Sequence, residues 1–184
     1  MKNAILSAVV IFIIGLGLLF PGCNPSGELI LNVSFDLNDR EEYPRSDQLV
    51  IWLQKPDGTF INSLFVSEYL SYGGYNDPDI CPDWTTKANW EEASQEEFDA
   101  VTGATPSIGP VQMELTLPVD QLPKGDYNIF IEVHQTADYN ELYSGSLRIS
   151  RKRYNSQLEV TYKPEKYPRA TFNVLSKVQI SLHE

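Results

Sequence analysis

The residues best suited to carry chemistry lie in one short segment, Asp-Ala-Val-Thr-Gly-Ala-Thr at residues 99–105. The segment consists of small side chains and two hydroxyl groups behind a single carboxylate. A threonine hydroxyl can accept a covalent group, and small neighbours leave room for another enzyme's pocket to reach it. Gly103 also permits a sharp turn of the backbone. The segment therefore predicts either a modification site or a structural turn.

The structural alternative rests on the residues just before this segment. Ser94 is followed by Glu97 at the spacing of a capping box, which predicts a helix from about Gln95 to Thr102. Gly103 would then end the helix as its C′ residue. In this alternative the Thr105 hydroxyl is buried or bonded to the backbone, as short hydroxyl side chains near helix ends often are.

The segments on either side of this helix have the pattern of β-strands. Apolar and polar residues alternate with period two, which places one face of each strand in a core. We expect about eight strands, at 28–37, 48–54, 59–66, 111–117, 126–135, 141–150, 156–162 and in two pieces within 170–182. Pro56-Asp57-Gly58 predicts a hairpin turn between the second and third strands. The fold class is thus an all-β, antiparallel Ig-like sandwich with one long loop and short-helix excursion over 67–110.

The front of the chain has the anatomy of a secretory signal. Lys2 precedes an apolar run from Ala4 to Phe20, and the run ends in Leu-Phe-Pro-Gly-Cys. Gly22-Cys23 resembles the end of a lipobox, after which Cys23 is lipidated. We therefore expect a lipoprotein signal peptide over 1–22, an anchor linker over 23–27 and one sandwich domain over 28–184. An ordinary signal peptide or a single membrane helix is the alternative.

Composition restricts the partners and the cofactors. The formal net charge is −11, so the phosphates of nucleic acids would be repelled. Cys81 has no partner if Cys23 carries lipid, and we expect it to be buried and inert. The positions of His134 and His183 do not suggest zinc.

Two further groups of side chains have a functional and a structural interpretation. Asp77, Asp79 and Asp83 could hold calcium, but a solvated acidic loop is the simpler reading. Trp84 and Trp90, together with nearby tyrosines, could line a site for a flat ring or could anchor the loop. We expect Trp52 to be buried in the core.

The chain resembles domain-of-unknown-function family 2271 in four segments that occur in the family's order. These are Leu-Val-Ile-Trp-Leu-Gln-Lys-Pro-Asp-Gly, Cys-Pro-Asp-Trp-Thr-Thr-Lys-Ala-Asn-Trp, Asp-Ala-Val-Thr-Gly-Ala-Thr and Leu-Pro-Lys-Gly-Asp-Tyr-Asn-Ile-Phe-Ile-Glu-Val. The resemblance implies an exported protein in an extracytoplasmic redox setting, because family genes tend to lie near flavin transferases and membrane reductases. The chain departs from the family at Pro106-Ser107, where a basic residue is usual.

Residues 99–105 are also similar to the attachment motif of FMN-binding subunits in the sodium-pumping NADH:quinone reductase. That resemblance makes Thr105 the acceptor of covalent FMN, Thr102 the internal hydroxyl, and Gly103-Ala104 the small residues between them. Asp99 would help to position the motif. It also implies a flavin transferase as a partner, which takes FMN from FAD.

The leading hypothesis is a membrane-anchored, exported redox accessory protein that carries or docks flavin and is not itself an enzyme. The alternative is a cofactor-free Ig-like binding or structural lipoprotein, including a ligand or adhesion module.

Overall fold

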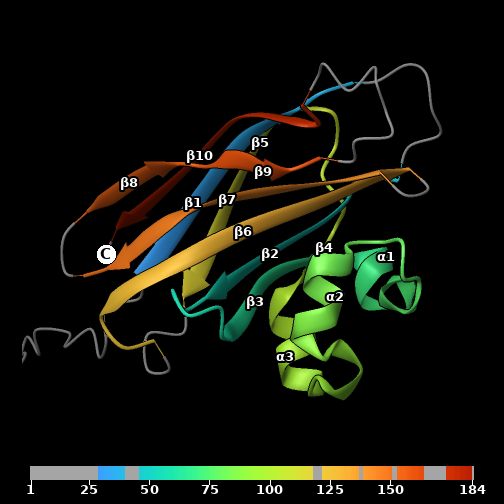
Figure 1. The fold of residues 1–184 in the computed structure, drawn as a ribbon, viewed down its shortest axis with the longest axis horizontal. Helices are drawn as coiled ribbons and strands as arrows, with labels where there is room; N and C mark the ends of the chain where they lie inside the picture. The colour runs from blue at the N-terminus through green and yellow to red at the C-terminus, as the bar shows by residue number, and fades with distance from the viewer. Residues whose placement is uncertain are drawn as a thin grey trace, which may run out of the picture.

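The computed structural model describes residues 29–39, 46–117, 122–136, 139–150, 153–163 and 173–183. Within these ranges the chain forms two β-sheets, with short helices gathered on one side of them (Figure 1). The sheets pack face to face around a shared apolar core, and every strand pairing but one is antiparallel. The predicted β-sandwich is therefore confirmed.

The smaller sheet has four strands in the order β5-β1-β10-β8. They are β5 Gly109–Leu117, β1 Leu29–Leu37, β10 Leu175–His183 and β8 Tyr154–Gln157. The larger sheet has six strands in the order β4-β3-β2-β6-β7-β9. They are β4 Thr102–Gly103, β3 Phe60–Ser67, β2 Gln48–Gln54, β6 Gly125–Thr136, β7 Tyr139–Ile149 and β9 Glu159–Tyr162.

The burial of β1 and β2 shows how the layers are arranged. Along β1, buried and half-buried residues alternate, because one face meets the core and the other faces outward. All seven residues of β2 are buried, because the larger sheet is covered on both faces. The predicted hairpin between β2 and β3 is confirmed, with Gly58 at a φ of 88° in the turn.

The predicted strand at 156–162 is wrong in one respect, because the chain changes sheets within it. Residues up to Gln157 belong to β8 in the smaller sheet, and residues from Glu159 belong to β9 in the larger one. Leu158 lies at the crossing, buried in the core, and its N–H donates to the carbonyl of Val178 at 3.0 Å. Of the two pieces expected within 170–182, the later one is β10, whereas residues 170–172 of the earlier one lie outside the described residues.

Two apolar clusters hold these layers together. The first lies between the sheets and includes Leu31, Ile131 and Ile180. The second lies between the outer face of the larger sheet and the helices, and it includes Trp52, Trp84 and Trp90. Trp52 is only 1% exposed and stacks on Phe130, with ring centroids 5.2 Å apart. Its predicted burial is thus confirmed, although it faces the helices.

The helices form a helical insert, which we define as residues 68–101 between β3 and β4. The insert contains α1 Glu68–Ser71, η1 Gly74–Asn76, α2 Pro82–Ala88, η2 Trp90–Glu92 and α3 Gln95–Val101. The sequence predicts α3 correctly to within a residue but reads most of the remainder as loop. These turns are too short to be stable alone, so their packing against the sheet stabilises them.

The expected signal segment, residues 1–22, and Cys23 lie outside the described residues. No helix within the described ranges is long and apolar enough to cross a membrane.

Candidate functional site

The Asp99–Thr105 segment leaves the helical insert and joins the larger sheet. Ser94 caps α3, since its side-chain oxygen accepts a hydrogen bond from the N–H of Glu97 at 3.1 Å. After α3 the backbone becomes extended at Thr102 and forms β4, which pairs in parallel with the end of β3. The segment thus begins on a capped helix and passes directly into a strand.

The first two polar groups of the segment already have partners in the protein. Asp99 is exposed, and its carboxylate accepts a hydrogen bond from the Gln95 side chain at 2.7 Å. The Thr102 hydroxyl lies 2.8 Å from the Ser71 hydroxyl at the end of α1. Thr102 therefore ties the segment to the helical insert.

Gly103 does not have the role that the sequence suggests. It does not take the positive-φ conformation of a helix-ending C′ residue and instead forms part of β4. A Cβ atom at Gly103 would lie 2.5 Å from Cε2 of Phe65. The physical reason for glycine here is therefore the close approach of the Phe65 ring.

Ala104 and Thr105 follow the strand in an irregular segment. Ala104 is exposed and Thr105 is half-buried. Within the described part of the chain, the Thr105 hydroxyl has no hydrogen-bond partner. It is thus less exposed than an open loop residue, yet it lacks the backbone bond that a helix-end hydroxyl often makes.

The two tryptophans of the insert are not an open surface for a flat ligand. Trp84 is 0% exposed and Trp90 is 5% exposed, and their rings contact each other at 5.3 Å. Their indole N–H groups donate to the Ser63 hydroxyl and to the Ser71 carbonyl. The interpretation of both residues as loop anchors is therefore the correct one.

Exposed aromatic surface beside the segment comes from tyrosines. Tyr72 is 71% exposed and packs edge-on against Phe98 of α3, at 4.9 Å between centroids. Tyr69 on α1 is 59% exposed. Since Tyr72 follows directly after Ser71, which contacts Thr102, these rings lie at the same end of the insert as the segment.

A buried polar network joins the insert to the sheet. The Glu132 carboxylate on β6 accepts hydrogen bonds from the backbone N–H groups of Asp83 and Trp84, at 3.2 and 2.9 Å. Burial raises the pKa of Glu132 to about 8. Asn140 on β7 accepts from the N–H of Cys81 and contacts Nδ1 of His134.

Cys81 and His134 take part in this network as structural groups. The Cys81 thiol is fully buried, and burial followed by the Glu132 charge raises its pKa well above the usual value. Burial lowers the pKa of His134. The burial of Cys81 expected from the sequence is confirmed, and a thiol with a raised pKa is a poor nucleophile.

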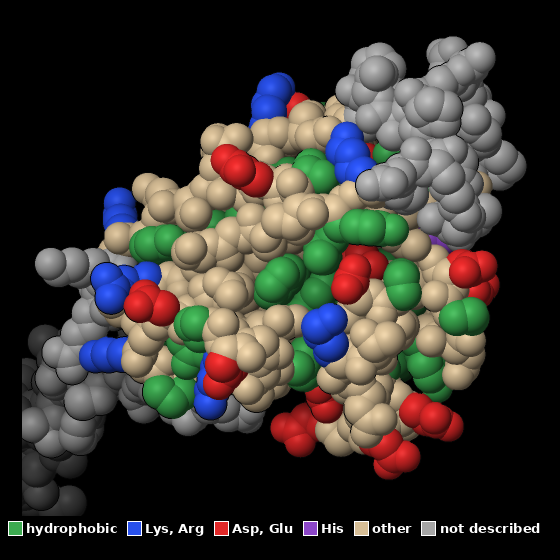
Figure 2. Space-filling view, in the orientation of Figure 1, with side chains coloured by type: hydrophobic (Ala, Val, Ile, Leu, Met, Phe, Trp, Pro, Cys, Tyr) green, Lys and Arg blue, Asp and Glu red, His purple; other side chains and the backbone are tan. Residues whose placement is uncertain are grey.

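The acidic side chains do not converge on a point. Asp77 uses its carboxylate to accept the N–H of Asp79 at 3.0 Å. In the described ranges, no group of three or more histidine, cysteine, aspartate or glutamate side chains is arranged to hold a metal ion. The insert instead presents acids to solvent, with nine acidic residues and one lysine over 68–101. Figure 2 shows acidic side chains gathered over the helices.

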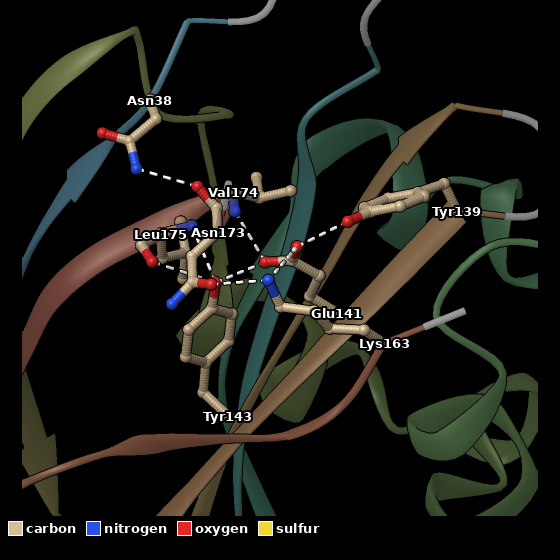
Figure 3. A network of polar contacts seen from close by, with 8 residues as sticks. All are labelled: Asn38, Tyr139, Glu141, Tyr143, Lys163, Asn173, Val174 and Leu175. Carbon is tan, nitrogen blue, oxygen red and sulfur yellow. Dashed lines mark hydrogen bonds and ion pairs between the residues drawn. The ribbon is translucent and has the colours of Figure 1, made fainter. Parts of the chain in front are cut away.

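A second buried carboxylate, Glu141 on β7, lies between the sheets and was not found from the sequence. It accepts hydrogen bonds from the hydroxyls of Tyr139 and Tyr143 and from the N–H of Val174 (Figure 3). Lys163 lies 3.6 Å away as an ion-pair partner. Burial, followed by the Glu141 charge, raises the pKa of Tyr143. The sequence does contain a signal for this site. Alternate residues of a strand share a face, so the pattern Tyr-x-Glu-x-Tyr places Glu141 between two tyrosines on the same face.

These features define a class: an all-β sandwich whose larger sheet carries a helical insert that leads into a small-residue segment. The chain belongs to the family described as "Predicted periplasmic protein (DUF2271)", which matches residues 30–167. The family resemblance expected from the sequence is confirmed, and the description supports export. No curated protein and no solved structure matches the chain.

Proposed function

We propose that this protein is a lipid-anchored flavin carrier outside the cytoplasm, with FMN joined through its phosphate to Thr105. The observation that carries the proposal is the Thr105 hydroxyl itself. It is half-buried, has no hydrogen-bond partner in the described residues, and follows a strand fixed to the sheet. A hydroxyl held in place without an internal partner suits a group that must react with an external phosphate.

The surrounding residues fit such an acceptor. Gly103 contacts the Phe65 ring so closely that β4 has room only for glycine, which fixes the strand before the acceptor. The exposed Ala104 adds little bulk beside Thr105, so a second enzyme can approach. Thr102 is held by Ser71, which leaves Thr105 as the available hydroxyl of the motif.

The modification step is a phosphoryl transfer in which no group is oxidised or reduced. The Thr105 oxygen would attack the FMN phosphorus of FAD in the active site of a flavin transferase. The Oγ–P bond forms, the pyrophosphate P–O bond breaks, and AMP leaves. The hydroxyl proton passes to a base of the transferase.

The bound flavin would supply the electron-transfer chemistry, and the protein would supply placement and environment. Tyr72 and Tyr69 are the exposed aromatic side chains at this end of the insert, and they offer faces for a flat ring. A membrane reductase is the partner class that such a carrier would serve. Cys23 would hold the carrier at the membrane through its lipid.

Co-expression of the full chain with a flavin transferase tests the proposal. We expect the wild-type chain to gain the mass of one FMN and to fluoresce in a denaturing gel, and the Thr105→Ala variant to lose both signals. Ser107→Ala is the matched control, because Ser107 is an exposed hydroxyl two residues further on. No added mass in the wild-type chain, while a known acceptor is labelled, would refute the carrier. A cofactor-free binding protein would then be the better interpretation.

A further inference from the structure

The outer face of the smaller sheet carries a groove that the flavin proposal does not use. The groove has a volume of about 510 Å³. It is lined by Asn32, Ser34, Asn155, Ser156, Gln157, Gln179, Ile180 and Ser181. These residues come from the three adjacent strands β1, β10 and β8.

The strand register arranges six of these side chains in two rows. Asn32 pairs with Ser181, which pairs with Asn155. Ser34 pairs with Gln179, which pairs with Gln157. Neighbouring strands lie ~4.8 Å apart, so each row spans ~10 Å across the sheet.

The rows face away from the core. Their neighbours in sequence, such as Leu31, Val33 and Leu182, are buried between the sheets, and successive side chains of a strand point to opposite faces. Asn155, Gln157 and Gln179 are exposed, whereas Asn32 and Ser34 are half-buried.

The hydrogen-bonding groups of the rows are largely uncommitted. Among the described residues, the six side chains make one side-chain hydrogen bond, between Nδ2 of Asn32 and Nδ1 of His183 at 3.0 Å. Amides and serine hydroxyls each provide both a donor and an acceptor. The groove therefore offers a dense set of donors and acceptors to a ligand.

The chemistry of the lining selects the class of ligand. None of the described lining residues is charged, although the chain as a whole carries a formal charge of −11. Within the described lining, an anionic polymer would find no cation, and a cationic one would find no carboxylate. Ile180 is the only apolar residue in the described lining, and it is 2% exposed. The ligand that matches is neutral and has many hydroxyl groups.

We propose that this groove binds a neutral glycan chain, with sugar hydroxyls and acetamido groups bonded to the two rows. The described lining contains no aromatic ring on which a sugar could stack. Binding by hydrogen bonds alone exchanges water for protein partners, so the net gain for each bond is modest. The complex is weak and exchanges rapidly.

Saturation-transfer difference NMR on the full-length protein suits a weak, rapidly exchanging ligand. The neutral probes are chitotetraose and maltotetraose, which distinguish acetamido from plain hydroxyl recognition, and polygalacturonate is the anionic control. We expect transfer to at least one neutral probe and none to polygalacturonate. Transfer to polygalacturonate alone, or to no neutral probe in the millimolar range, would overturn the proposal.

Variants locate the site. Asn155→Ala with Gln157→Ala should weaken binding at least tenfold, and Gln179→Ala is a second variant on the neighbouring strand should the first fail to fold. Asn76→Ala, an exposed amide on the helical insert, is the matched control and should bind as the wild type does. Equal binding by all groove variants would place the sugar elsewhere and refute the assignment. The protein could also associate with itself without sugar and lose that association in the groove variants. This result would show that a second copy of the chain covers the face, and it would also refute the glycan assignment.

Discussion

The carboxylate of Glu132, in the middle of the larger sheet, accepts the backbone N–H of Trp84 at 2.9 Å. The same side chain accepts the N–H of Asp83, so one residue of β6 satisfies two donors in the first turn of α2. Those donors have no partner inside a helix. Glu132 therefore fixes both the start of α2 and the position of Trp84 in the second apolar cluster.

Replacement of Glu132 by glutamine should destabilise the protein. Both oxygens of a carboxyl group can accept a hydrogen bond, with or without the proton, whereas the amide NH₂ group cannot, so a buried N–H of α2 loses its partner. We expect a loss of about 1–3 kcal/mol in the free energy of unfolding, measured by urea denaturation. Glu91→Gln, at an exposed position of η2, is the control and should change stability by less than about 0.5 kcal/mol. Equal behaviour of the two variants would contradict the capping role.

The stability that Glu132 contributes should depend on pH. Burial, against the opposing hydrogen bonds from the N–H groups of Trp84 and Asp83, raises its pKa in the folded state from 4.5 to about 8; the Asp83 charge acts in the same direction as burial, and Lys87 acts against it. The folded state thus binds the proton more tightly than the unfolded state. The contribution is fully present below pH 4.5 and decreases as pH rises towards 8. The wild type should therefore lose its excess stability over Glu132→Gln as pH rises from 4.5 to about 8. A stability difference that grows over this pH range would show that the pKa of Glu132 is not raised.

A methyl group at position 103 should be poorly tolerated. In Gly103→Ala the new Cβ would meet the Phe65 ring at 2.5 Å, so the ring or β4 must move. Overpacking of this kind costs about 1–3 kcal/mol, which thermal or urea unfolding would detect. Gly125→Ala is the matched control, since nothing lies within 4 Å of its Cβ position. A stability equal to that of the wild type would mean that the Phe65 ring adjusts freely.

Loss of the Tyr143 hydroxyl should weaken the link between the sheets. This hydroxyl donates to Glu141 on the same strand and accepts the N–H of Leu175 on β10 at 2.8 Å. In Tyr143→Phe that buried N–H is unpaired, and we expect a cost of about 1–3 kcal/mol in denaturant unfolding. Tyr162→Phe removes a hydroxyl from a side chain that is 51% exposed and should have little effect. An unchanged free energy of unfolding in Tyr143→Phe would show that water replaces the hydroxyl as the partner of the Leu175 N–H.

The proposed lipid anchor at Cys23 makes a separate prediction. A Cys23→Ser chain should leave the membrane fraction or stay unprocessed, because stable attachment needs the added acyl chains. Fractionation and N-terminal sequencing measure the two outcomes. Normal processing together with unchanged membrane attachment would rule out lipidation at Cys23.

The strands could be predicted because their pattern is local. Alternation along β1 and the apolar run of β2 are visible in a few consecutive residues, and both elements lie where the sequence places them. The capping box before α3 is equally local and is confirmed at Ser94. Short-range periodicity and turn chemistry therefore suffice for most of the sandwich.

The site was harder to predict, because its constraints come from distant residues. Gly103 looks like a helix stop in sequence, but the atom that excludes a side chain belongs to Phe65, which lies 38 residues earlier. Trp84 looks like a surface aromatic in a polar loop, and its burial depends on Ser63 and Glu132. Contacts of this range cannot be read from spacing alone.

If Cys23 carries lipid as proposed, the register of β1 gives the molecule a near and a far end relative to that anchor. Leu29 pairs with Leu117, whereas Leu37, at the other end of the strand, pairs with Gly109. Eight steps of a strand span ~26 Å. Thr105 precedes Gly109 by four residues, which reach at most ~14 Å when extended. A chain held at the membrane ahead of Leu29 therefore carries Thr105 at least ~12 Å further out along the strand axis. His183, at the end of β10, pairs with Ile30, so under the proposed anchoring a fusion after β10 would sit near the lipid surface and leave the proposed acceptor hydroxyl of Thr105 unobstructed.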